Sequence, residues 1–156
     1  MAKKKVKPVP KGYHSVQVSL NLTDAKSAID FCKKVFDAKV RGVMPGPNGK
    51  IVHAEVKLGD SVEMFSDAVV DPPFPGNLMV YVPNADKTFA KAVKAGAKEL
   101  MAPTDQFWGD RFSRVEDPFG NRWGIATHIE DVTPKQMKKR MADMVTGAAK
   151  SGGKKK

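Results

Sequence analysis

The sequence contains an internal repeat, and this feature limits the possible folds more than any other. A shift of 60 residues aligns a strand, a helix start and a turn of the first half with those of the second half: Leu20–Leu22 with Val80–Val82, Ala25 with Ala85, and Gly49 with Gly109. A shift of 61 aligns a second turn, Gly59–Asp60 with Gly120–Asn121. Identity between the halves is low, so the repeat consists of matching apolar faces and turns. Such self-similarity predicts two structural units of the same kind.

Each half has the pattern of a strand, a helix and three strands. In the first half, apolar residues alternate over 13–22, which is typical of a strand with one buried side. Asp24 is a plausible N-cap for a helix whose apolar stripe reaches Phe36. After a Pro/Gly turn, the runs 51–58 and 61–65 alternate again and predict a hairpin. The second half repeats this order.

Four strands cannot bury an apolar face on their own, so the helices must pack on it. The expected fold class is α+β: two tandem βαβββ modules, at about residues 13–67 and 76–128, form a curved mixed sheet around a cleft. A proline-rich linker, 66–76, joins them. A C-terminal helix is predicted over 133–146, with Thr133 as its N-cap and a stripe of methionines on one side.

The net charge of +10 comes almost entirely from the two ends of the chain. Nine lysines lie in residues 1–11 and 146–156, where there are no acids, and residues 12–145 carry 18 basic and 17 acidic side chains. A folded part so close to neutral excludes a basic nucleic-acid groove. We expect 1–11 and 147–156 to be disordered tails around a single domain at 12–146, and the tails to bind nucleic acid only non-specifically.

The single cysteine, Cys32, cannot form an intramolecular disulfide, which favours a reducing compartment and a cytoplasmic location. Cys32 falls on the apolar stripe of the first helix, so it is interpreted as a core residue. No apolar run approaches the roughly 18 residues of a membrane-spanning helix, so no membrane contact is expected.

The predicted strands also have a polar face, opposite to the one the helices cover. Its members are Gln17, Ser19, Asn21, His53, Glu55, Glu63, Asn77, Tyr81, Arg111 and Ser113, with Phe65 and Met79 among them. A solvated face is ordinary for an antiparallel sheet. The alternative is a cleft in which these groups converge on a ligand. We favour the cleft, because a cluster of His53, Glu55 and Glu63 is costly to place by accident.

Residues 24–31 follow the first strand, and Asp117-Pro118-Phe119-Gly120-Asn121 precedes the last one. These segments resemble the vicinal-oxygen-chelate superfamily, which contains glyoxalase I, bleomycin-resistance proteins and extradiol dioxygenases. The segments 49–55, 58–61 and 105–111 are similar to the branch named after a phosphonate-operon protein and often labelled demethylubiquinone-methyltransferase-like. The likeness covers about His14 to Glu130.

The resemblance implies four positions for ligands of one divalent metal ion, which fall on Gln17, Glu63, Asn77 and Gly124. Only Glu63 is a strong ligand, because neutral amides are poor donors and glycine offers no side chain. We therefore predict that the family metal and any other cofactor are absent. The alternative is a divalent metal ion held by His53, Glu55 and Glu63.

Two residues near the end of the second module have two interpretations each. Trp108 is expected either to cover the cleft and stack on a ligand or to anchor its loop. Arg111 is expected either to bind an anionic ligand group or to form a salt bridge with Asp110 or Glu63. His14 and His128 lie near strand ends, where surface or capping roles prevail.

Three functions compete at this point. The first is a metal-independent protein that binds a small polar or aromatic molecule through Gln17, Glu55, Asn77, Met79, Trp108 and Arg111, together with His53 and Glu63. The second is a lyase-, isomerase- or dioxygenase-type enzyme of the superfamily, with His53 or Glu63 as catalytic base. The third is a nucleic-acid-associated protein that acts through its tails. A homodimer is expected, since the resemblance implies a cleft completed across subunits and the methionine stripe needs cover.

Overall fold

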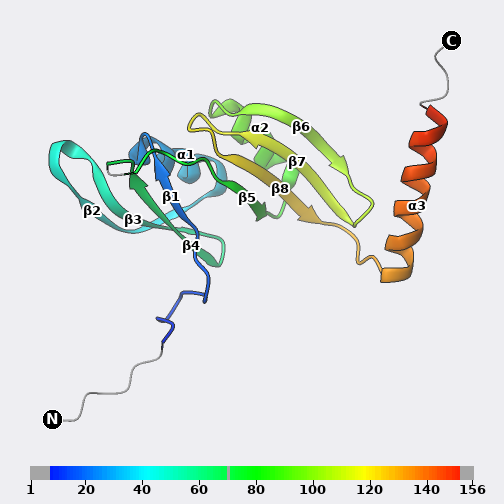
Figure 1. The fold of residues 1–156 in the computed structure, drawn as a ribbon, viewed down its shortest axis with the longest axis horizontal. Helices are drawn as coiled ribbons and strands as arrows, with labels where there is room; N and C mark the ends of the chain where they lie inside the picture. Colours follow the sequence, from blue (N-terminus) through cyan, green and yellow to red (C-terminus); the bar gives the residue numbers. More distant parts are fainter. Residues whose placement is uncertain (1–7, 70, 152–156) are drawn as a thin grey trace.

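The computed structural model describes residues 8–69 and 71–151, and the side chains up to residue 144. It contains two four-stranded mixed sheets with one helix each, and a C-terminal helix (Figure 1). The first module comprises β1 (Ser19–Leu22), α1 (Ala25–Phe36), β2 (Lys39–Pro45), the short helix η1 (Pro47–Gly49), β3 (Ile51–Leu58) and β4 (Ser61–Asp67). The second comprises β5 (Asn77–Tyr81), α2 (Ala85–Lys94), β6 (Lys98–Asp105), β7 (Asp110–Glu116) and β8 (Arg122–His128), and α3 (Pro134–Ser151) follows.

The two sheets have the same strand order. The first is β1-β4-β3-β2 and the second is β5-β8-β7-β6, with the first and last strands of each module parallel and the other neighbours antiparallel. The predicted α+β fold of two βαβββ modules is thus confirmed. In the described residues, however, the strands form two separate sheets instead of the single curved sheet that was expected.

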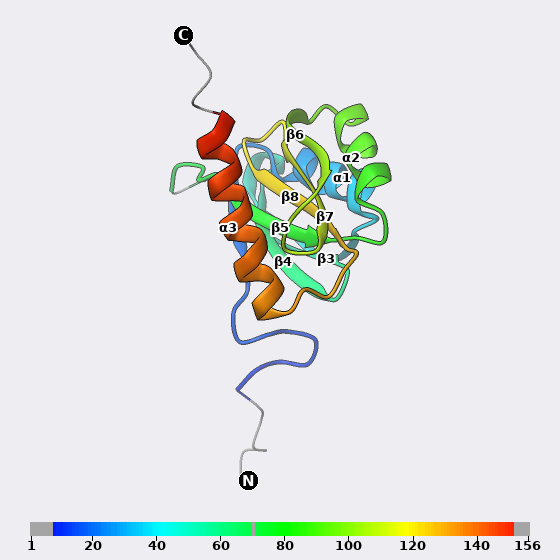
Figure 2. The same ribbon diagram turned by 90° about the vertical axis from the view of Figure 1, so that its right-hand side faces the viewer.

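The first helix is where the sequence predicts it, and it is capped as expected. The Asp24 carboxylate accepts a hydrogen bond from the backbone N–H of Ser27 at 2.9 Å. Helices α1 and α2 cover one face of the sheets, and together they enclose a continuous apolar core that includes Leu22, Phe65 and Ile125 (Figure 2). Cys32 is buried in this core, and burial raises the pKa of its thiol. It is thus a core residue, as interpreted from its stripe.

We call the other face of each sheet, which points away from α1 and α2, the open face. Helix α3 lies on that side of the molecule (Figure 2). A capping box starts α3: Thr133 Oγ1 accepts from the backbone N–H of Gln136, whose Oε1 accepts from the N–H of Thr133. The helix runs past Gly147, where the sequence analysis ended it, because one glycine inside a helix costs only about 1 kcal/mol.

The first strand differs from its prediction. It starts at Ser19 instead of Tyr13, and Val16 and Val18, which were expected to be buried, are exposed. The reason is pairing: the backbone contact between β1 and β4 begins with the hydrogen bond from the Met64 N–H to the Val18 carbonyl. Residues 1–7 and 152–156 of the predicted tails lie outside the described residues, and 147–151, which were expected to be disordered, belong to α3. No described helix is long and apolar enough to cross a membrane.

Candidate functional site

The register of β3 against β4 decides which side chains share a face of the first sheet. Residues directly opposite in an antiparallel pair point to the same side. Ala54 pairs with Phe65 and Val56 pairs with Glu63, and Ala54, Val56 and Phe65 are all part of the core. Glu63 therefore lies on the helix-covered face.

His53 and Glu55 lie on the open face, because they alternate with the buried Ala54 and Val56. Their side chains approach to 3.8 Å between His53 Nε2 and Glu55 Oε1. The residue of β4 opposite Glu55 is Met64. The predicted cluster of His53, Glu55 and Glu63 is thus wrong, since the sheet separates Glu63 from the other two.

The helix-covered position gives Glu63 an unusual environment. Its Oε2 atom is buried and has no hydrogen-bond partner, and burial raises the pKa of the carboxyl group. It lines a hollow of about 310 Å³ between the β3–β4 turn and β5, which Tyr81 and Trp123 also line. Glu55 has the opposite environment: a hydrogen bond from Tyr13 lowers its pKa, and Arg41 lies 3.9 Å away.

The parallel pairs show how the two halves correspond. Ser19 pairs with Met64, and Met79 pairs with Gly124, so both members shift by 60 residues. Gly124 therefore corresponds to Met64. The shift of 61 that was expected for the last strand of each module is wrong. It was derived from the residue types of the turns, and turns can differ in length without changing how the strands correspond.

The four residues implied by the family resemblance do not fit a divalent metal ion. Glu63 faces the helices, and the corresponding open-face residue is Met64, whose thioether is a poor ligand for a hard or borderline cation. Gly124 has no side chain, and Gln17 and Asn77 offer neutral amides. The Gln17 Nε2 atom is buried without a hydrogen-bond partner. The described residues hold no group of three His, Cys, Asp or Glu side chains arranged for a metal.

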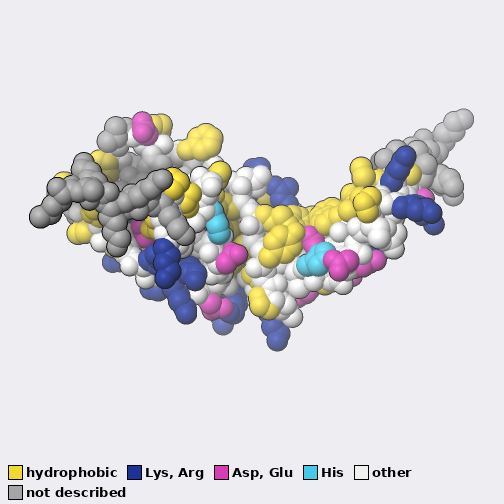
Figure 3. All heavy atoms as spheres, turned by 90° about the horizontal axis from the view of Figure 1, so that it is seen from below, with side chains coloured by type: hydrophobic (Ala, Val, Ile, Leu, Met, Phe, Trp, Pro, Cys, Tyr) yellow, Lys and Arg dark blue, Asp and Glu magenta, His cyan; other side chains and the backbone are white. Residues whose placement is uncertain are grey.

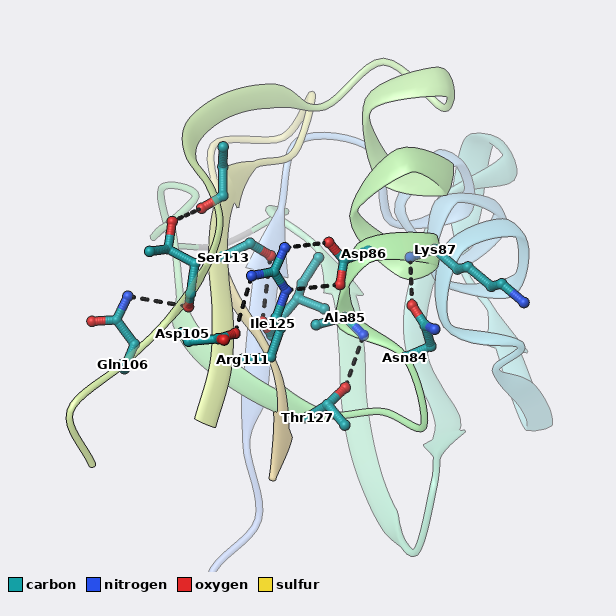
Figure 4. A network of polar contacts seen from close by, with 12 residues as sticks. Asn84, Ala85, Asp86, Lys87, Asp105, Gln106, Arg111, Ser113, Ile125 and Thr127 are labelled. Carbon is teal, nitrogen blue, oxygen red and sulfur yellow. Dashed lines mark hydrogen bonds and ion pairs between the residues drawn. The ribbon is translucent and has the colours of Figure 1, made fainter. Parts of the chain in front are cut away.

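Arg111 also lies on the helix-covered face, opposite to its prediction. It pairs with Thr127, its Nη2 lies 2.7 Å from Asp86 of α2, and its Nη1 lies 3.0 Å from Asp105 of β6 (Figure 4). The Thr127 hydroxyl, in turn, accepts from the Ala85 N–H at the start of α2. The salt-bridge interpretation holds, with partners other than those expected, and Arg111 ties α2 to the sheet.

Asn77, Met79 and Tyr81 lie on the open face of the second sheet, as expected. Asn77 and Met79 border a hollow of about 400 Å³, which Leu78, Phe112, Arg114 and Gly124 also line. The glycine is needed here, because a Cβ atom at 124 would lie 2.8 Å from the Phe112 ring. Arg114 was missed because the sequence analysis assigned Ser113 to the polar face; the apolar Val115, on the same side of the strand as Ser113, indicates the opposite assignment.

A cluster around the buried Asp110 closes one end of this face. Its carboxylate accepts hydrogen bonds from Tyr81 Oη and Trp108 Nε1, both at 3.0 Å, and His128 Nδ1 lies 2.8 Å from its other oxygen. These contacts hold Trp108 beside Phe112, with 5.8 Å between ring centroids. The Asp110 contact, and a second one to Asp131, raise the pKa of His128. The sequence predicted only a surface or capping role for His128.

Another hollow lies on the first module. It has a volume of about 690 Å³ and is bounded by the open face of β1 and β4, by η1 and by the proline-rich linker, and its lining includes Ser19, Val52, Ser66 and Phe74. Asn21 fixes the linker by donating hydrogen bonds to the carbonyls of Asp71 and Pro72. The wall of this hollow is mainly apolar, with a few polar groups, as is usual in small-molecule sites.

The architecture is that of a paired-module protein: it has two βαβββ modules, with helices on one side of the sheets and open, partly hollowed faces on the other. Residues 14–125 match the model of the Glyoxalase/Bleomycin resistance protein/Dioxygenase superfamily. The chain belongs to this superfamily, as its resemblance implied.

Known proteins agree with this assignment. The uncharacterized protein Mb0911c of Mycobacterium bovis is 34% identical over 140 residues, which cover 82% of this chain and 92% of the relative. The crystal structure of TioX from Micromonospora sp. ML1 is similar with a TM-score of 0.63 and 26% identity, over 74% of this chain and 100% of TioX. TnmS3, an antibiotic binding protein from Streptomyces sp. CB03234, has a TM-score of 0.59 at 24% identity, over 74% and 95%. This last likeness is one of fold.

Proposed function

We propose that this protein binds a small, largely apolar molecule on the open faces of its sheets and does so without the metal ion of its family. The observation that carries the proposal is the 690 Å³ hollow on the first module, whose size and mainly apolar wall are those of a small-molecule site. Met64 and Gly124 support the metal-independent part, because they replace the oxygen ligands that a divalent ion needs.

Two exposed valines offer a matched test. Val52 lines the hollow and is 48% exposed, whereas Val43 on β2 is 49% exposed and lies outside it. Val52→Trp places a bulky side chain in the wall of the hollow and should reduce the retention of a co-purified small molecule in native mass spectrometry. Val43→Trp should leave retention unchanged. Equal retention by both variants, or one transition-metal ion per chain in elemental analysis, would contradict the proposal.

A catalytic role for Glu63 is the second candidate. A partly buried carboxyl group with a raised pKa, lining a hollow next to Tyr81, is suited to take a proton at neutral pH. His53, the other predicted base, lies on the opposite face of the sheet and belongs to a different surface. Glu63→Gln should then abolish turnover of a substrate that His53→Gln leaves unaffected.

The homodimer and the cytoplasmic location stay predictions. Dimerisation has support in exposed apolar side chains on the open-face side of β2 and on α3, which are Met44, Met141 and Met144. Seen from below, apolar side chains gather over the middle of the molecule and continue toward α3 (Figure 3). A second copy that covers this surface would also enclose the open faces.

A further inference from the structure

Arg114 stands out among the arginines of this chain because none of the described carboxylates forms an ion pair with it. Each of the other four lies within 4 Å of a carboxylate: Arg41 near Glu55, Arg111 near Asp86 and Asp105, Arg122 near Glu116 and Arg140 near Glu130. Within the described part of the chain, Arg114 has no ion-pair or hydrogen-bond partner. It is nevertheless partly buried.

The strand places Arg114 in the middle of the open face. Its neighbours Ser113 and Val115 are buried toward the helices, and its antiparallel partner is Gly124 on the central strand β8. The Phe112 ring and Met79 occupy the space that a side chain at 124 would take. Arg114 and Gly124 both line the 400 Å³ hollow described above.

The remaining wall of the hollow is apolar and aromatic. Phe112 lies over Gly124, Met79 borders it from β5, and Trp108 packs against Phe112 at 5.8 Å. The exposed Asn77 adds an amide with no hydrogen-bond partner among the described residues. A planar cation beside an aromatic wall matches a flat molecule that carries an oxyanion, since guanidinium binds carboxylate, sulfonate or phosphonate oxygens in a fork.

We propose that the open face of the second sheet binds an aromatic oxyanion, with Arg114 holding the anionic group and Phe112 and Met79 packing on the ring. This inference rests on the proposed small-molecule function and specifies its ligand class. Arg114 is a specificity-determining residue here, because an uncharged aromatic molecule would use the same apolar wall without gaining from the guanidinium group.

Two fluorescent probes separate the charge from the apolar wall. Anilinonaphthalene sulfonate carries the anion, and anilinonaphthalene is the same ring system without it. We expect the wild-type protein to bind the sulfonate at least about tenfold more tightly, as befits a hydrogen-bonded ion pair. Arg114→Gln should remove this preference and leave the neutral probe unaffected, and Arg114→Lys should restore part of it.

Arg122→Gln is the matched control. Arg122 lies on the same face of the same sheet but is paired with Glu116, so both probes should bind this variant as they bind the wild type. Circular dichroism verifies that each variant is folded. The inference is overturned if Arg114→Gln binds the sulfonate as the wild type does, if the wild type shows no preference, or if neither probe binds. None of these results touches the Val52→Trp comparison, so the proposed function fails or stands separately.

Discussion

Glu63 gives the sharpest test of the structure, because its position inverts the usual effect of removing a charge. The Oε2 atom is buried without a partner, and burial raises the pKa of the carboxyl group above its ordinary value. A buried, unsatisfied polar group costs about 1–3 kcal/mol, but solvent reaches this partly buried side chain. We therefore expect Glu63→Gln to stabilise the protein by about 1 kcal/mol at about pH 7.5.

The sign follows from proton linkage. With the folded-state pKa above the unfolded one, the folded protein binds more protons, so the wild type loses stability as the pH rises through the unfolded pKa of about 4.3. Below that pH both states are protonated, and the penalty is absent. The gain of Glu63→Gln should accordingly vanish at about pH 3.5.

Urea unfolding followed by circular dichroism, at both pH values, measures this difference. Glu55→Gln is the control of opposite sign, because the hydrogen bond from Tyr13 lowers the pKa of Glu55 and its charge stabilises the fold at neutral pH. If Glu63→Gln is less stable than the wild type at neutral pH, or if its gain persists in acid, Glu63 is not an unpaired carboxylate on the helix-covered face.

Three further predictions concern other parts of the molecule. The contacts of His128 with Asp110 and Asp131 raise its pKa, so the imidazolium stabilises the fold at acidic pH. This contribution disappears as the pH rises through the folded-state pKa. Thermal unfolding should therefore show His128→Asn to be less stable than the wild type at about pH 5.5, with a smaller deficit at about pH 8.5. Gly109 has a φ of 98°, and the Cβ of Gly109→Ala would clash with the Glu130 carbonyl. At Gly59 the φ of 57° alone costs about 1 kcal/mol, because nothing lies within 4 Å of an added Cβ. Gly109→Ala should therefore lower the unfolding midpoint in urea far more than Gly59→Ala. If α3 contributes to a dimer, Met141→Glu with Met144→Glu should yield monomers in sedimentation analysis, whereas Lys138→Glu with Lys139→Glu should not.

The sequence by itself determined the local structure and the number of modules. Alternation, the Asp24 cap and the Gly59–Asp60 turn located a helix and a hairpin that the structure confirms, with the second strand running two residues further than predicted, to Asp67. Each of these signals depends on residues close together in the chain. The duplicated order of apolar faces identified the fold class, since a sheet with one apolar face and an amphipathic helix bury those faces by packing on each other.

Which side chains meet was decided by the tertiary structure. A one-residue error in assigning β4 moves Glu63 to the other face, because side chains alternate with a period of two, and the pairing of Val56 with Glu63 is what fixes the assignment. In the same way, the sheet directs Arg111 to the acids of α2 and β6 and leaves Arg114 on the open face. A sequence lists its charged residues, but the partners that neutralise them come from distant elements, so only the folded chain shows which charge remains for a ligand.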